Sequence, residues 1–121
     1  MKISQFKVIP FTIPFVNPLQ TSNATYAHRD GVWLKMKWKN LSGFGEAAPL
    51  PGFSKENLNE VHYALEGFHQ VIKNEEMDEE ELFKLVEVHS QNQPSVRFAI
   101  ETAIHDLLSQ DSGKPMSKNI N

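Results

Sequence analysis

Two periods of hydrophobic positions divide the chain into a first half that predicts strands and a second half that predicts helices. In residues 9–15 the hydrophobic side chains share one face of an extended segment: Ile9, Phe11, Ile13 and Phe15. In residues 32–39 the hydrophobic positions again alternate: Val32, Leu34, Met36 and Trp38. Trp33 and three lysines occupy the other face of that segment. Such alternation is typical of half-buried antiparallel strands.

Prolines and turn residues set the expected limits of these strands. Pro10 and Pro14 exclude a central position for the first strand and favour an edge. Residues 16–30 are mostly polar and predict a long loop. Residues 40–43 predict a turn, and residues 44–48 predict a third, short strand that is ended by prolines. The first half is therefore expected to be a three-stranded antiparallel meander.

The hydrophobic period becomes helical after Ser54, a residue type that favours the N-cap position. The stripe of the first helix is Leu58, Val61, Leu65, Phe68 and Ile72. A second helix is expected from about Asp78 to His89, with three inward residues: Leu82, Leu85 and Val86. A third helix is expected to begin near Pro94 and to end at Gly113. Its stripe is Val96, Ile100, Ala103, Ile104 and Leu107.

Segregated strands and helices predict an α+β fold, here a three-stranded antiparallel β-meander followed by a three-helix bundle. We expect one domain over residues 1–112, with the meander in residues 2–49 and the helices in residues 54–110. The helices should cover one face of the sheet, because neither layer can bury its hydrophobic face alone.

Composition narrows the class of protein. The 121 residues include no cysteine, which excludes disulfides, thiolate metal sites and cysteine nucleophiles. The net charge is −3, and Arg29 and Arg97 are the only arginines, so the basic footprint of a nucleic-acid binder is missing. No signal-peptide pattern and no apolar run of membrane-spanning length are present. We therefore expect a cytoplasmic protein that binds neither nucleic acid nor membrane.

Clusters of ionisable residues have structural explanations. Lys35, Lys37 and Lys39 share one strand face and are interpreted as its solvated side rather than as a catalytic lysine pair. The acidic run of residues 78–81 suits the positive end of a helix dipole and is not spaced as a metal site. No two of the five histidines have the spacing of metal ligands, and only His28, in the expected loop, merits a test.

Three segments carry a resemblance to a known family: RDGVWL at residues 29–34, GFGEAAPLPGFSKE at residues 43–56 and PSVRFAIETAIHD at residues 94–106. They resemble the N-terminal capping domain of enolase-superfamily enzymes in the muconate-lactonizing subgroup. The second segment is most similar to o-succinylbenzoate synthases. The resemblance covers nearly the whole chain.

The resemblance implies a domain that closes over the mouth of a (β/α)₈-type barrel, which supplies the chemistry. In such enzymes a barrel lysine removes a proton next to a carboxylate, and Mg²⁺ held by three barrel acids stabilises the enediolate. For o-succinylbenzoate synthase the reaction is a dehydration in menaquinone biosynthesis. Residues 113–121 would begin the linker to the barrel. No catalytic residue and no metal ligand are then expected in this chain, which alone should be inactive.

The resemblance also implies that two segments face the substrate, residues 17–29 and residues 48–54. The candidate substrate-binding residues are Arg29, Leu50, Pro51, Gly52, Phe53 and Ser54. Arg29 suits a small carboxylate substrate, although a salt bridge within the sheet is the favoured explanation. Glu46, at a strand end, is expected to make structural hydrogen bonds.

Other functions remain open at this point. The cap of a dipeptide epimerase or of a muconate cycloisomerase would share the fold. A free-standing, non-catalytic binding module is an alternative of another class. The enzyme interpretation predicts an exposed apolar surface toward the barrel, or self-association that covers it.

Overall fold

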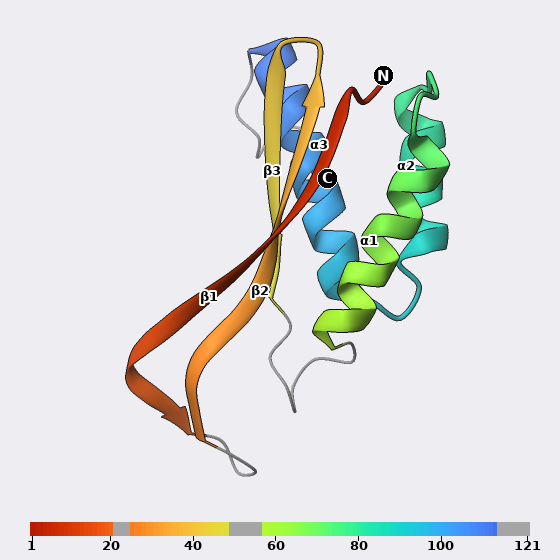
Figure 1. Ribbon diagram of the computed structural model, residues 1–121. Coiled ribbons are helices and arrows are strands. Elements are labelled where there is room, and N and C mark those ends of the chain that lie inside the picture. Colours follow the sequence, from red (N-terminus) through yellow and green to blue (C-terminus); the bar gives the residue numbers. More distant parts are fainter. Residues whose placement is uncertain (21–24, 49–56, 114–121) are drawn as a thin grey trace.

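The computed structural model describes residues 1–20, 25–48 and 57–113. Three strands form one antiparallel sheet in the order β1–β2–β3: β1 Gln5–Gln20, β2 Thr25–Trp38 and β3 Leu41–Ala47. Three helices follow: α1 Leu58–Ile72, α2 Glu79–His89 and α3 Pro94–Ser112. Figure 1 shows all three helices on one side of the sheet, with α3 lying along β3. The predicted α+β fold, a meander followed by three helices, is confirmed.

The first two strands are longer than the sequence predicts. The expected loop at residues 16–30 is instead largely strand, because β1 continues to Gln20 and β2 begins at Thr25. The pairing of the two strands shifts register between Pro14 and Leu19. β1 is the edge strand that its prolines indicate, and at an edge a missing N–H on the open side does not interrupt the ladder. The resulting hairpin projects beyond the helical layer (Figure 1).

The second hairpin turns earlier and more tightly than expected. Trp38 pairs with Leu41, so that Lys39 and Asn40 alone form the turn. Lys39 has a φ of 58°, in the left-handed region that a tight hairpin turn demands. Residues 41–43 of the predicted turn therefore belong to β3, and Asn40 remains in the turn.

The first helix begins later than predicted. Its N-cap is Asn57, whose Oδ1 accepts a hydrogen bond of 2.9 Å from the backbone N–H of Glu60. The side-chain amide of Asn57 also donates to Glu60 Oε1 over 2.7 Å. Ser54, the expected cap, lies outside the described residues. Asparagine caps a helix as well as serine does, and Glu60 three residues on gives a reciprocal pair. The sequence interpretation placed this signal one turn too early.

The other helix ends agree with the sequence. Asp78 is the N-cap of α2, and Pro94 is the first residue of α3. Gly113 ends α3 with a φ of 72°, the left-handed conformation in which glycine is favoured.

The core lies between the inner face of the sheet and the helices. Leu34 and Met36 of β2 are fully buried, and the predicted helical stripes are buried except at two half-buried positions, Leu58 and Leu85. The fully buried stripe residues include Leu65, Phe68, Ile100, Ile104 and Leu107.

Glycines let α3 approach β3 closely. A methyl group at Gly45 would lie within 3.0 Å of the carbonyl oxygen of Ala99. A methyl group at Gly43 would likewise lie within 3.0 Å of the carbonyl oxygen of Ala103. Since both obstacles are helix backbone, neither can be relieved by a side-chain rotation. The two glycines are therefore required by packing.

The outer face of the sheet is apolar as well as basic. Four large hydrophobic side chains are exposed there: Ile9, Ile13, Trp33 and Phe44. The ring of Phe11 covers Gly31 across the strand pair, where a methyl group would clash with that ring. Lys35 and Lys37 are half-buried on this face and Lys39 is exposed, which agrees with their interpretation as the solvated side of the strand. The four hydrophobic side chains therefore form an apolar surface that the described helices do not cover.

We predict that Gly45→Ala lowers the free energy of unfolding by about 3 kcal/mol or more, because the added methyl group meets helix backbone. Chemical denaturation followed by circular dichroism measures the change.

Gly67→Ala provides the matched control. Gly67 lies within α1, and a methyl group there would meet no atom of the described residues within 4 Å. This substitution should instead raise the free energy of unfolding by about 0.5–1 kcal/mol, since alanine favours a helix interior over glycine. Equal destabilisation by both substitutions would contradict the packing argument.

Candidate functional site

A hollow of about 510 Å³ opens where the N-terminal part of β2 and the C-terminal end of β3 meet the start of α3. Its lining residues come from all three elements: Arg29, Glu46, Ala48, Pro94, Ser95 and Phe98. Ala48 is the last residue described before the segment 49–56. The hollow therefore adjoins the segment that the sequence assigns to the substrate.

Arg29 is bound to the end of the third strand. Its Nε donates a hydrogen bond of 3.1 Å to the carbonyl oxygen of Ala48, and its Nη2 donates to the same oxygen. The described partner is thus a backbone carbonyl, where the sequence suggested a salt bridge or a substrate carboxylate. A guanidinium carries five N–H donors, so one carbonyl oxygen does not saturate it. Arg29 can fasten the strand end and still face a ligand.

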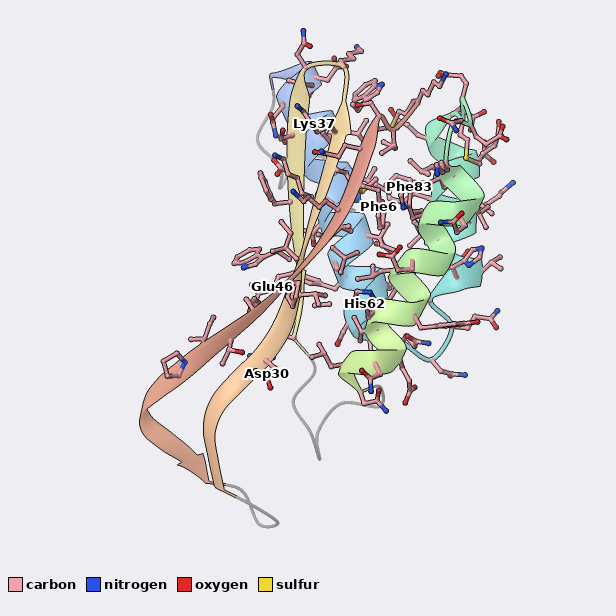
Figure 2. The ribbon with its side chains drawn as sticks, in the orientation of Figure 1. Phe6, Asp30, Lys37, Glu46, His62 and Phe83 are labelled. Carbon is pink, nitrogen blue, oxygen red and sulfur yellow. The ribbon has the colours of Figure 1, made fainter. Side chains whose placement is uncertain are left out.

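A cross-strand hydrogen bond stabilises the backbone that carries Arg29. Thr12 Oγ1 of β1 donates to Asp30 Oδ1 of β2 over 2.6 Å, and the two residues are partners in the strand register. Figure 2 shows Asp30 on β2, beyond Glu46 toward the projecting hairpin. This pair adds a side-chain link between β1 and β2 next to Arg29.

Phe98 supplies the apolar wall of the hollow. It lies in the second turn of α3, and 64% of its side chain is exposed. Glu46 of β3 and Arg29 of β2 place one carboxylate and one guanidinium at the same hollow. An aromatic face next to a cation and polar groups suits a small, partly apolar anion.

Sequence reasoning found one side of this hollow and missed the other. Arg29 lines it as expected, but Leu50, Pro51, Gly52, Phe53 and Ser54 lie outside the described residues. The lining residues Pro94, Ser95 and Phe98 were not proposed as site residues. Phe98 falls off the buried stripe of its helix, and a large aromatic residue on the polar face was the available signal.

The acidic run acts as a helix start. Asp78 Oδ1 accepts a hydrogen bond of 2.8 Å from the backbone N–H of Glu81, and that bond holds the pKa of Asp78 below its ordinary value. The hydrogen bond and charge of Asp78 raise the pKa of Glu81 in turn. Within residues 1–20, 25–48 and 57–113, no three histidine or acidic side chains gather as a metal site.

The histidines mainly contact aromatic rings. His69 stacks on Phe6 at 4.9 Å between ring centroids, and His105 stacks on Phe83 at 5.0 Å. The side chain of His28 lies outside the described part of the chain. A second hollow of about 370 Å³ lies between α2 and α3 beside His105. Both acidic and basic side chains line it, among them Arg97 and Glu101. The hydrogen bond to Glu101 and its negative charge raise the pKa of Arg97.

Comparison with protein families gives one match that covers most of the chain. The family described as MenC, N-terminal domain, matches residues 3–107. Among curated proteins, the o-succinylbenzoate synthase of Yersinia pestis (strain Pestoides F) is 50% identical over 38 residues. That alignment covers 31% of this chain and 12% of the relative.

Solved structures share the fold over nearly the whole chain. The substrate-liganded L-Ala-D/L-Glu epimerase from Bacillus subtilis superposes with a TM-score of 0.86 at 19% identity, covering 98% of this chain and 34% of that one. The dipeptide epimerase from Methylococcus capsulatus, complexed with Mg and the dipeptide L-Arg-D-Lys, gives 0.85 at 23% identity with the same coverage. This chain therefore spans about a third of the length of these relatives. Among the described residues, no helix is long and apolar enough to cross a membrane.

We predict that Arg29→Ala lowers the free energy of unfolding by about 1 kcal/mol, because the carbonyl oxygen of Ala48 loses both donors. Thermal and chemical unfolding of the purified chain would measure the loss.

Arg97→Ala is the matched control, since Arg97 is the other arginine and is also exposed. It pairs with Glu101 within one helix, and because this pair faces solvent it contributes little to stability. An Arg29→Ala variant as stable as Arg97→Ala would show that the link to Ala48 does not stabilise the sheet.

Proposed function

The chain belongs to the family of MenC N-terminal domains, and from this premise we propose that it is the substrate-side cap of an o-succinylbenzoate synthase-like dehydratase. Its fold is that of the N-terminal capping domain of enolase-superfamily enzymes. The single observation that carries the finer proposal is the family match over residues 3–107, supported by the 50% identity to an o-succinylbenzoate synthase over 38 residues.

The chemistry of the hollow is compatible with this proposal. The product, o-succinylbenzoate, carries carboxylates and an aromatic ring. Arg29 offers a guanidinium fork to a carboxylate, and the exposed ring of Phe98 offers an apolar wall. Both side chains are held by regular structure rather than by the adjoining segment. Such a site binds and orients a substrate without reacting with it.

The proposed division of labour leaves the reacting groups on a barrel domain. The described residues of this chain do not fit a Mg²⁺ site, because no three acidic or histidine side chains converge. Mg²⁺ would stabilise an enediolate from the barrel, where the lysine base is also expected. The contribution of this domain is to bind the carboxylate, enclose the ring and exclude water from the mouth of the barrel.

We predict that the protein carrying this domain together with its barrel forms o-succinylbenzoate in the presence of Mg²⁺, and that the 121-residue chain alone does not. Chromatographic detection of the product measures the reaction. Epimerisation of L-Ala-D/L-Glu or another dipeptide without dehydration would instead make the protein an epimerase with the same cap. Neither reaction, together with a chain that functions without a barrel, would favour a free-standing binding module.

Within that enzyme, we predict that Arg29→Lys raises KM about tenfold and changes kcat little. Lysine keeps the positive charge but loses the two-pronged geometry, and a contact made equally in ground and transition states affects KM. Steady-state kinetics with Arg97→Lys as the control measure the effect. A fall in kcat with unchanged KM would exclude Arg29 from substrate binding and place its effect on the chemical step.

A further inference from the structure

The two edges of the sheet differ in how they are protected. At the β1 edge, Pro10 and Pro14 cannot donate backbone hydrogen bonds, and Lys2 forms an isolated bridge with Glu76. β3, at the other edge, contains two glycines and no proline. An edge strand of this kind presents backbone donors and acceptors that can pair with a further strand. Protection at β3 must therefore come from outside the strand.

Two side chains of α3 bind the outward-facing backbone of β3. Asp106 Oδ2 accepts a hydrogen bond of 2.9 Å from the N–H of Phe44. Gln110 Nε2 donates to the carbonyl oxygen of Ser42 over 2.6 Å and to Asp106 Oδ1 over 3.0 Å. The donor and the acceptor thus support each other while each binds the strand.

The spacing of the two helix residues matches the spacing of the two strand residues that they bind. Ser42 and Phe44 are two residues apart, so they recur on the same edge of the strand with a residue spacing of about 6.8 Å. Asp106 and Gln110 are four residues apart on α3, which is about 6.0 Å along a helix. One helical turn of side chains therefore spans one repeat of the strand.

We propose that Asp106 and Gln110 form an edge cap that takes the place of a fourth strand and keeps β3 from pairing with β3 of a second copy. Phe44 makes this protection necessary, because 45% of its side chain is exposed at the same edge. An open edge next to an exposed aromatic residue is a template for association. The proposal does not depend on the reaction that the protein takes part in.

Amide hydrogen exchange at Phe44 tests the first half of the proposal. In the parent chain, this amide should exchange at least tenfold more slowly than an unprotected amide, although it faces away from β2. Asp106→Ala should restore fast exchange in dilute solution. A Phe44 amide that already exchanges freely in the parent would overturn the cap.

Light scattering tests the second half, with Gln110 as the position for matched variants because it is exposed. Gln110→Lys keeps a donor for Ser42 and Asp106, so the average mass should equal that of the parent at the same concentration. Gln110→Glu places a carboxylate against two acceptors, so the average mass should rise at least twofold as copies pair. Equal masses for the two variants would overturn the proposal, even if Asp106→Ala fails to fold.

Discussion

The backbone of α3 lies so close to that of β3 that glycine is required at positions 43 and 45. The contacts follow a fixed register, in which Gly45 meets Ala99 and Gly43 meets Ala103. The strand and the helix run in opposite directions. A step of two residues on the strand, about 6.8 Å, therefore matches a step of four residues on the helix, about 6.0 Å. Because the contact is between backbones, it tolerates little sliding, and the remaining helices pack on a platform whose geometry is already set.

The same register builds the candidate site. Glu46 follows Gly45, and Phe98 precedes Ala99, so the two lining residues are neighbours in sequence of the two residues that touch. Arg29 then joins β2 to the end of β3 through Ala48. The glycines that permit close packing thus also determine how far the aromatic wall stands from the guanidinium. A substitution that moved the helix outward would widen the hollow before it altered any lining side chain.

Local chemistry explains which features the sequence could predict. Asp78 and Pro94 have strong positional preferences, and the starts of α2 and α3 were predicted to within a residue. The extended hairpin was missed, because residues 16–20 and 25–30 become strand by pairing across their own hairpin, as Leu19 does with Tyr26, rather than through their own preference. The cap of α1 was misplaced because Asn57 and Ser54 are chemically equivalent signals. Close approach of backbones leaves no mark in a hydrophobic pattern, and on the α3 side of the site the available signal was the exposed aromatic residue Phe98.

The sheet has protected edges and an open face. Prolines protect β1 and α3 side chains protect β3, while Ile9, Ile13, Trp33 and Phe44 remain exposed on the outer face. A neighbouring domain can therefore cover this sheet by packing side chains against it but not by adding a strand. Side-chain packing fixes a rigid orientation without joining two folding units into one sheet. That property suits a cap, which must be positioned accurately over another domain and still fold as a unit of its own.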